Sequence, residues 1–419
     1  MRDNRVLSKN FTRKRKLPFT SLILFMMNII KQTIQKELTR FIKMLDNKNS
    51  NVSKSAFSQS RVKLKPEAFI ELNNCLTEEF YTDNVIKKWK GFRLVGIDGS
   101  KLILPTNSDE LMKKFGTLSS GMIIPQAQIS SCFDLLNEII IDSQLETLQV
   151  NEMNQAIRHF DHLSQGDLVI TDRGYAATWF YYMQKINEVN FVNRVPKNFR
   201  KDAEDFRVSD DDEKIIEINI PPQKSRYGLQ RHGFTKKQLE PFKVRLVKVI
   251  LDDGEVEVLA TTLIDKEKYP IEIFKELYFM RWGIEINYDH LKSNINVEEF
   301  TGLSEIAIRQ DFYASMFINN LQSVIALDSQ EEMDEENKEK EKATGKKRKY
   351  DYKVNKNLSL GYMKDKIIDI FISNSPRYYD EIIKLFKTNP VPIRKGRKNP
   401  RKSQDSNRRK HFMNRKRAV

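Results

Sequence analysis

The sequence contains little cysteine and little histidine. Among 419 residues only two are cysteine, Cys75 and Cys132, and neither belongs to a CxxC pair or a Cys/His cluster. We therefore expect no disulfide framework and no structural zinc site, and we expect a reducing compartment. The five histidines are scattered and no P-loop is present, so neither histidine chemistry nor a nucleotide-binding loop competes for a catalytic role.

Long apolar runs are missing as well. The longest, FTSLILFMMNII at residues 19–30, has about twelve residues, whereas a membrane-spanning helix needs about twenty. The basic RKRK before this run leaves a signal peptide open, but no small-residue cleavage site follows. We interpret the run as a buried helix of a cytoplasmic protein that does not interact with membranes.

Positive charge is in excess and is concentrated at the two ends of the chain. Lys and Arg number 72 and Asp and Glu number 57, which gives a formal net charge of +15. Residues 391–419 contain twelve basic residues and one acidic residue, and residues 1–16 contain seven and one. Together, the two ends therefore carry a larger positive charge than the net charge of the whole chain. Such tails suit a polyanion, although a disordered solubilising tail has the same composition.

The N-terminal part favours helices. Residues 17–46 are predicted to form one helix, a serine at 53 or 55 can cap a short second helix, and a third begins near Pro66. Three basic residues lie between the two shorter helices: Arg61, Lys63 and Lys65. This arrangement fits a small DNA-binding unit and ordinary helical packing equally well.

Strands dominate from residue 92 onward. FRLVGIDGSKLILP predicts a strand, a break at Gly99 and a second extended piece. A helix is predicted near 152–163, a buried strand at 168–171, a helix near 177–186 and a strand at 190–195. This order of elements is typical of a mixed α/β layer with helices on the faces of a sheet.

The pattern changes again after residue 195. The segments KIIEINI, FKVRLVKVIL and EVEVLATTLI predict strands within a mostly β insertion of residues 196–265. A long helix then contains YFMRWGIEINYDHLK, and another runs near 304–327. A charged, weakly hydrophobic linker follows, and two further helices are predicted near 357–372 and 376–388.

Two aspartates follow apolar runs in which a carboxylate is costly unless it is paired or holds a metal. Asp98 lies within LVGIDGS, and Asp172 follows LVIT directly. Each alone has an ordinary explanation, because Asp98–Gly99 is a turn dipeptide and Asp172 can cap the next helix. The individual residues therefore leave the choice open.

The stretch YFMRWGIEINYDHLK places four functional side chains close together. On an α-helix, Tyr278, Arg281, Glu285 and Lys292 share an arc of about 60°. A solvated face with an Arg281–Glu285 ion pair explains this arc equally well and stabilises the helix by only a few tenths of a kcal/mol. One carboxylate on an early strand, one on a later strand and one on this helix suit Mg²⁺, and two such ions can clamp an in-line phosphoryl transfer.

These motifs resemble those of bacterial insertion-sequence DDE transposases of the YREK-signature group, insertion sequence family four. YFMRWGIEINYDHLK is similar to the signature Y-x2-R-x3-E-x6-K at all four positions, and IDGSKLILP and ITDRGYAA resemble the first- and second-aspartate motifs. The β-rich insertion and the segment SKSAFSQSRVKLKPEAF also resemble parts of that family. The resemblance covers roughly residues 50–325.

The resemblance implies roles for individual residues. Asp98, Asp172 and Glu285 are expected to be catalytic and to hold Mg²⁺, as two ions, with Mn²⁺ able to substitute. Tyr278, Arg281 and Lys292 are expected to hold a DNA phosphate near the transposon end. Lys292 lies about 10 Å along the helix from Glu285, too far to share the metal centre. Arg173 is a further candidate DNA contact because it adjoins Asp172.

The expected fold is α/β, with an RNase H-like mixed-sheet catalytic core that a β-rich insertion interrupts, and helical N- and C-terminal regions. The expected parts are a helical DNA-binding region (1–85), the first core segment (86–195), the insertion (196–265), the second core segment (266–328), a charged linker (329–354), a helical region (355–390) and a basic tail (391–419).

The implied function is DNA transposition. The enzyme would cleave the transposon ends in a metal-dependent reaction and transfer the free 3′-OH to target DNA. Its partners would be double-stranded DNA, as terminal inverted repeats and target, and a second copy of itself in a synaptic homodimer. Two alternatives stay open: an RNase H-like nuclease without strand transfer, and an inactive DNA-binding relative that acts as a repressor.

Overall fold

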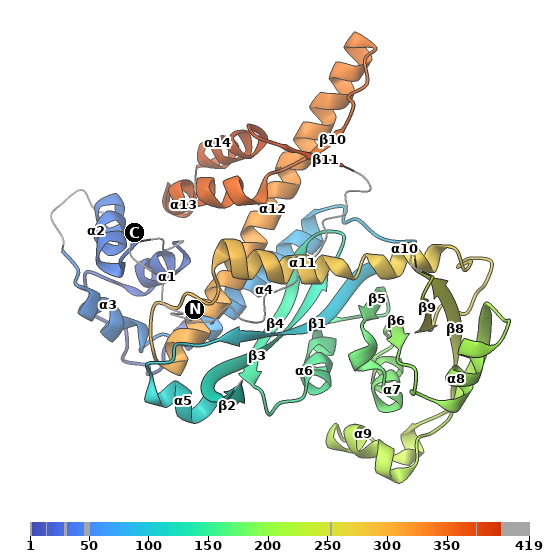
Figure 1. Cartoon of the computed structure of the whole chain (residues 1–419). Helices are drawn as coiled ribbons and strands as arrows, with labels where there is room; N and C mark the ends of the chain where they lie inside the picture. The colour runs from blue at the N-terminus through green and yellow to red at the C-terminus, as the bar shows by residue number, and fades with distance from the viewer. Residues whose placement is uncertain are drawn as a thin grey trace. The chain divides into compact units, whose positions relative to one another are not determined.

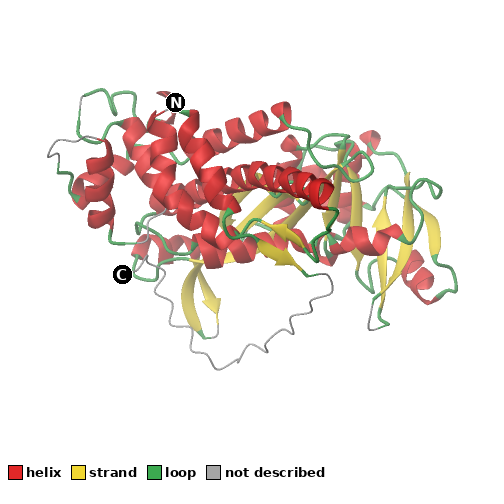
Figure 2. Cartoon of the chain, turned by 90° about the horizontal axis from the view of Figure 1, so that it is seen from above, coloured by secondary structure: helices red, strands yellow, loops and turns green. Residues whose placement is uncertain are grey.

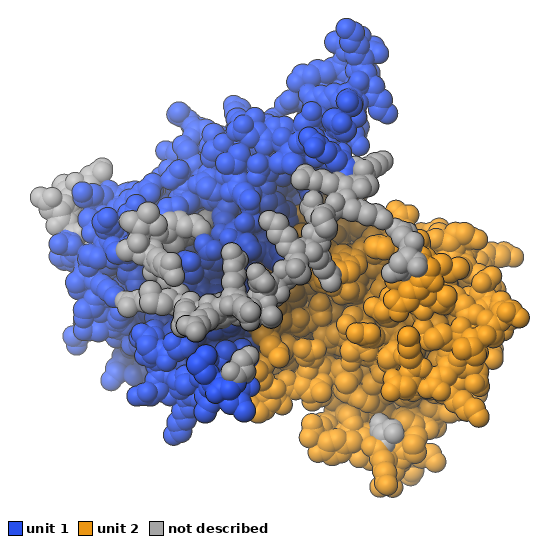
Figure 3. Space-filling model, in the orientation of Figure 1, with its two compact units in different colours: residues 1–83, 102–127, 289–419 blue, residues 84–101, 128–288 orange. Residues whose placement is uncertain are grey.

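The structure is a computed structural model that describes residues 2–13, 15–28, 32–45, 51–119, 121–251, 254–373 and 375–394. The chain forms two compact units that alternate along the sequence (Figures 1 and 3). The first unit comprises Met1–Asp83, Leu102–Ala127 and Asp289–Val419. The second unit comprises Asn84–Lys101 and Gln128–Tyr288. Both are mixtures of helix and strand, so the fold class is α/β.

The first unit is mainly helical (Figure 2). Its helices are α1 (Phe19–Met27), α2 (Ile34–Leu45), α3 (Lys54–Arg61), α4 (Glu67–Asp83), α5 (Asp109–Phe115), α12 (Glu305–Thr344), α13 (Lys356–Ser373) and α14 (Pro376–Lys387), with the short 3-10 helix η1 (Arg2–Asn4) and the π-helical turn η6 (Leu291–Ile295). Helix α12 packs against α1, α4, α13 and α14. It is therefore the element around which the other helices of this unit assemble.

Short strands complete the first unit. Strand β2 (Gly116–Ser119) forms an antiparallel hairpin with the start of β3 (Met122–Asp134). Strand β10 (Asp351–Lys353) pairs with β11 (Val391–Ile393). The start of the predicted basic tail is thus a strand, and residues 395–419 of that tail lie outside the described residues.

Three predictions about the first unit can be compared with the structure. The predicted helix over 17–46 is wrong, because α1 ends at Met27 and α2 begins at Ile34. The charged segment 329–354 is helical as far as Thr344 and is not an irregular linker. Its Glu and Lys residues are strong helix formers, and Lys387 of α14 bonds Glu332 and Glu336. The two C-terminal helices are confirmed almost to the residue.

The second unit is built on one mixed sheet. Its strands are β1 (Arg93–Ile103, of which the last two residues belong to the first unit), the second half of β3, β4 (Ile139–Thr147), β5 (Asp167–Thr171), β6 (Asn190–Val195), β7 (Glu213–Ile218), β8 (Phe242–Ile250) and β9 (Val256–Thr261). They lie in the order β3-β1-β5-β6-β9-β8-β7, and β4 pairs with β3. Strands β1, β5 and β6 are parallel, whereas β9, β8 and β7 continue the sheet in antiparallel fashion.

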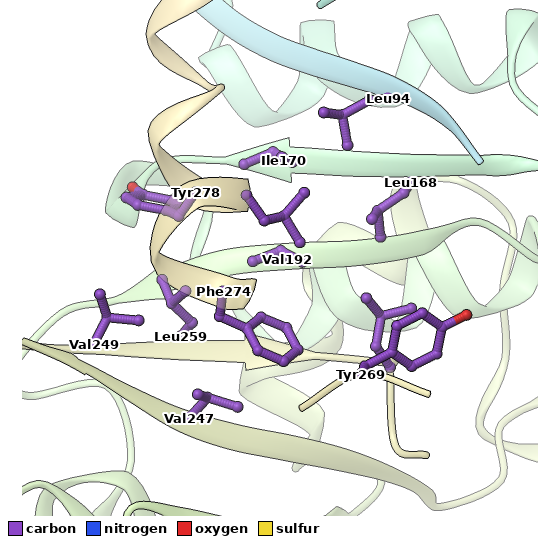
Figure 4. Packing of buried hydrophobic residues seen from close by; sticks show 12 residues of the cluster. Leu94, Leu168, Ile170, Val192, Val247, Val249, Leu259, Tyr269, Phe274 and Tyr278 are labelled. Atoms are coloured by element: carbon purple, nitrogen blue, oxygen red, sulfur yellow. The ribbon is translucent and has the colours of Figure 1, made fainter. Parts of the chain in front are cut away.

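Helices cover both faces of this sheet. The helical segments of the second unit are α6 (Glu152–Arg158), η2 (His159–His162), η3 (Arg173–Tyr175), α7 (Thr178–Ile186), α8 (Lys201–Val208), η4 (Gln223–Arg226), α9 (Tyr227–Arg231), η5 (Lys236–Gln238), α10 (Ile273–Phe279) and most of α11 (Trp282–His290). Phe274 of α10 packs in one core cluster with Val192 of β6 (Figure 4). Tyr181 of α7 stacks on the neighbouring Phe191, with ring centroids 4.7 Å apart. Consecutive strand residues point to opposite faces, so α10 and α7 cover opposite faces.

The order of elements predicted for this unit is largely confirmed. The strands at 168–171 and 190–195 and the helix near 177–186 agree with β5, β6 and α7 to within about one residue. The break predicted at Gly99 is wrong, because β1 continues without interruption to Ile103. The strands of residues 196–265 join the same sheet, since β9 pairs directly with β6.

None of the described helices combines the length and the apolar composition that crossing a bilayer requires.

Candidate active site

The parallel strands β1 and β5 bring the two aspartates to the same level. Gly96 of β1 pairs with Ile170 of β5, and two further residues along each strand lead to Asp98 and Asp172. Asn193 of β6 fixes the second aspartate, because its side-chain amide donates to the carbonyl oxygen of Asp172 at 2.7 Å. The parallel register thus places Asp98, in the middle of β1, at the level of Asp172, which directly follows β5.

The glutamate comes from a helix that is broken close to it. Helix α10 ends at Phe279 and α11 begins at Trp282. The amide of Arg281 donates to the carbonyl oxygen of Tyr278 at 3.1 Å, which is a tighter turn than that of an α-helix. The single helix predicted for YFMRWGIEINYDHLK is therefore wrong. The arc calculated for one continuous helix does not hold, and Arg281 lies at the junction of two shorter helices.

Arg281 lies between two of the carboxylates. Its Nη2 donates to Oε1 of Glu285 at 2.7 Å, and its Nη1 is 3.8 Å from Oδ2 of Asp98. The Arg281 side chain is 10 % exposed, compared with 35 % for Glu285 and 21 % for Asp98. Because the ion pair with Glu285 is shielded from water, it is stronger than a solvated pair at the same spacing.

The electrostatics at Asp98 show an excess of negative charge. The pKa of Asp98 is raised to about 6; burial is the largest cause, and the charges of Asp172 and Glu285 act in the same direction. The amide of Gly99, which donates to Oδ1, and the guanidinium of Arg281 act in the opposite direction. The three carboxylates are thus close enough to influence one another, and Arg281 neutralises them only in part.

Asp172 also has the structural role that its position after a strand suggests. Its Oδ1 accepts a hydrogen bond from the amide of Gly174 at 2.7 Å and caps the short helix η3. The capping interpretation and the functional one are therefore compatible at this residue. Arg173, the next residue, is exposed on the surface of the second unit.

Two of the predicted DNA contacts are placed differently. Tyr278 is buried in the core cluster beneath α10, and its hydroxyl oxygen has no hydrogen-bond partner among the described residues (Figure 4). Burial raises the pKa of Tyr278 to about 12. This location argues against direct contact of its ring with DNA. The structure brings together Asp98, Asp172, Glu285 and Arg281 within the second unit, whereas Lys292 lies on η6 and belongs to the first unit.

The sequence analysis did not identify three polar residues near these carboxylates, namely Glu152, Tyr175 and Tyr288. Tyr288 on α11 donates its hydroxyl to the carbonyl oxygen of Asp98 at 2.7 Å and so ties α11 to β1. Tyr175 has a buried hydroxyl without a hydrogen-bond partner among the described residues. Burial, and then the charges of Asp98 and Glu152, raise the pKa of Tyr175 well above its usual value. In the sequence, only the position of Tyr288, three residues after Glu285, could have indicated one of these residues.

The carboxylate oxygens of this cluster are the kind of atom that binds a divalent cation. Carboxylate oxygens are the ligands that Mg²⁺ and Mn²⁺ prefer, and burial, with smaller effects of Asp172 and Glu285, raises the pKa of Asp98. Among the described residues, however, no three acidic, His or Cys side chains are arranged closely enough to hold a metal. The guanidinium of Arg281 supplies the positive charge between Asp98 and Glu285 in this arrangement.

Comparison with known proteins agrees with this chemistry. The family model described as "Transposase DDE domain" matches residues 124–321, which include Asp172, Arg281 and Glu285. The transposase InsG for insertion sequence element IS4 of Escherichia coli (strain K12) is 21% identical over 317 residues, which cover 74% of this chain and 70% of that protein. These similarities support an IS4-like DDE transposase.

A solved structure is also similar to this chain. It is a piggyBac transposase synaptic complex with hairpin DNA, 11% identical, with a TM-score of 0.41, and the match covers 92% of this chain and 78% of that one. Asp98 lies before the residues that the family model matches, so its place beside Asp172 and Glu285 comes from the structure alone. The same matches support an enzyme of DNA cleavage and strand transfer, and DDE transposases generally use divalent metal ions.

Proposed function

We propose that this transposase hydrolyses a phosphodiester bond at each end of its element and then joins the free 3′-OH to target DNA by direct transesterification. The observation that carries the proposal is the convergence of Asp98, Asp172 and Glu285 from two parallel strands and a helix, with the pKa of Asp98 raised to about 6. A carboxylate with a perturbed pKa inside a cluster of acidic side chains is a candidate for a role in chemistry.

The carboxylates would hold the cofactor, and the cations around them would hold DNA. Two Mg²⁺ ions, or Mn²⁺ in their place, would be bound by Asp98, Asp172 and Glu285 and would activate the nucleophile and neutralise the leaving oxygen. Arg281 offers a planar fork for a phosphate, and the exposed Arg173 and the half-buried Lys292 add cations for the DNA backbone. Tyr278 contributes through Arg281, whose guanidinium carbon lies 5.7 Å from the centre of its ring.

We further propose that the strands in the order β4-β3-β1-β5-β6 form an RNase H-like core, and that residues 196–265 are an insertion whose strands lengthen its sheet. The support is the connection between β6 and β9. The chain leaves the sheet after β6 and returns to it as β9, which pairs with β6 before α10 begins. The insertion thus enters and leaves at one edge and does not disturb the level of Asp98 and Asp172.

The N-terminal helices are proposed to bind the terminal inverted repeats. Helices α2 and α3 and the segment before α1 line a hollow of about 1200 Å³ in the first unit. Four basic residues and a glutamine contribute to its lining: Arg15, Lys16, Lys43, Lys63 and Gln59. Cations of this density bind phosphates, and a glutamine amide is suited to reading a base edge. Each subunit of a homodimer would bind one transposon end in this way.

Single-residue variants and two DNA substrates test the proposal. Asp98→Ala, Asp172→Ala and Glu285→Ala should each abolish nicking of end DNA with Mg²⁺ or Mn²⁺ while end binding in a gel-shift assay persists. Lys292→Ala should retain nicking at a reduced rate, because it removes a cation and no metal ligand. Mg²⁺-dependent nicking by one of the three alanine variants would remove that residue from the catalytic set.

The same preparations distinguish the two alternative functions. Precut ends should be joined to a target plasmid by the unmodified protein, and failure to join them while intact ends are nicked would indicate a nuclease. Binding of end DNA without nicking by the unmodified protein would indicate a repressor.

A further inference from the structure

The guanidinium of Arg281 is held tightly on one side and loosely on the other. Its bond to Glu285 is short, at 2.7 Å, whereas its approach to Asp98 is 3.8 Å. Its Nε is buried and has no hydrogen-bond partner among the described residues. A buried donor without a partner is costly, so this arrangement of Arg281 stores the free energy of an unmade bond.

This guanidinium is a permanent positive charge at the site. Burial acts to lower the pKa of Arg281, but the neighbouring Tyr278, Glu285 and Asp98 raise it above its usual value. A divalent cation that approaches Asp98 and Glu285 therefore meets a like charge that already occupies one oxygen of Glu285. Metal and guanidinium compete for the same carboxylates.

A DNA phosphate offers Arg281 a better set of partners. Two phosphate oxygens can accept two parallel hydrogen bonds from a guanidinium, and this bidentate geometry adds to the attraction of opposite charges. Arg281 lies at the junction between α10 and α11 and not within a continuous helix. The partner change would then free Glu285 and remove the positive charge from Asp98.

We propose that Arg281 couples DNA binding to metal binding. In the DNA-free protein it neutralises Asp98 and Glu285 and thereby weakens their affinity for divalent cations; a phosphate of the transposon end draws it away, and the carboxylates then bind metal. The inference rests on the proposed metal-binding role of these carboxylates. Its consequence is a transposase whose metal centre assembles only on DNA, with the reciprocal effect that metal strengthens end binding.

Titration with Mn²⁺ tests this coupling without any catalytic readout. Free Mn²⁺ is measured by electron paramagnetic resonance for the full-length protein without DNA. Arg281→Gln should bind Mn²⁺ about ten-fold or more tightly than the unmodified protein, since a charge-assisted bond to Glu285 no longer opposes the metal. Arg281→Lys keeps the charge and should bind Mn²⁺ like the unmodified protein. Arg194→Gln is the matched control, because Arg194 is a neighbouring cation that pairs with Glu257 at 2.5 Å.

A second titration adds a precut end duplex, which has no scissile bond. The duplex should raise the Mn²⁺ affinity of the unmodified protein toward that of Arg281→Gln and should leave the affinity of Arg281→Gln nearly unchanged. Equal, weaker or undetectable Mn²⁺ binding by folded, DNA-free Arg281→Gln would overturn the inference and make Arg281 a residue that only orients Glu285. The proposed function fails separately, if Asp98→Ala binds Mn²⁺ as well as the unmodified protein does.

Discussion

Asp98 makes the fold less stable above the raised pKa of its carboxyl group. The pKa of its carboxyl group, ordinarily 3.8, is about 6 in the folded protein, mainly because of burial. The unfolded chain therefore releases this proton at lower pH than the folded protein, and the free energy of unfolding falls as pH rises from about 4 through 6. A shift of about two units corresponds to roughly 3 kcal/mol.

This shift gives a prediction for metal-free protein. In the presence of a chelator, Asp98→Asn should be as stable as the unmodified protein near pH 3, below the pKa of the unfolded chain, and more stable by roughly 3 kcal/mol near pH 8. Urea unfolding across this pH range measures the difference. A difference that does not change with pH would show that Asp98 is not the group whose ionisation is opposed by burial.

At the scale of residues, the sequence predicted the carboxylates better than their surroundings. Asp98 and Asp172 were predictable because a carboxylate at the end of an apolar strand is conspicuous, and Glu285 because its signature spacing is short and local. The burial of Tyr278 could not be predicted, since helical spacing says which residues share a face but not which face is buried. Glu152 lies near Tyr175 only because of the tertiary structure, and no local sequence pattern predicts this proximity.

Arg61 illustrates the same limit at the scale of elements. It lies at the end of α3 between helices that the sequence allowed as a DNA-binding unit, yet its side chain is buried. Its guanidinium pairs with Asp311 at 2.9 Å and donates to Thr301, Gln310 and the carbonyl oxygen of Ala307. Arg61 therefore fixes α3 on α12, within the first unit, and presents nothing to DNA.

We predict that Arg61→Leu lowers the free energy of unfolding by about 3–5 kcal/mol, because it leaves the buried carboxylate of Asp311 without its cation. Lys63→Ala, two residues away and half-buried, is the control and should cost less than about 0.5 kcal/mol. Chemical denaturation of both variants provides the measurement. An Arg61→Leu protein of normal stability that fails to bind DNA would restore the DNA-binding interpretation.

The helical elements were predicted where local signals exist and misjudged where packing decides. Ser53 caps α3 through the amide of Ala56, and Ser304 caps α12 through that of Ala307, as such residues do in many helices. No proline in the sequence predicts the break between α10 and α11. It follows from burial of α10 on the sheet and from the close packing of Gly283, where an added Cβ would lie 3.1 Å from Leu135.

At the scale of the molecule, the charge distribution supports one further prediction. Truncation after Arg394 keeps strand β11 and removes most of the C-terminal basic residues, which lie outside the described residues. DNA binding should weaken for all sequences alike, and the salt dependence should flatten by about 0.9 in log–log slope for each DNA phosphate that the tail no longer neutralises. Fluorescence anisotropy at several salt concentrations measures this slope for end DNA and for unrelated DNA. An unchanged slope would mean that the tail serves solubility or a protein partner.

The arrangement of the sheet also has a consequence for the order in which the protein is made. One face of β5 and β6 is covered by Phe274, Leu277 and Tyr278 of α10, which the ribosome delivers only after the whole insertion and its strands β7, β8 and β9. At about 5–20 residues per second, the apolar face of the nascent sheet stays open for several seconds. The helix that closes this face leads directly into the one that carries Glu285, so closure of the core and completion of the carboxylate cluster belong to one late event in synthesis.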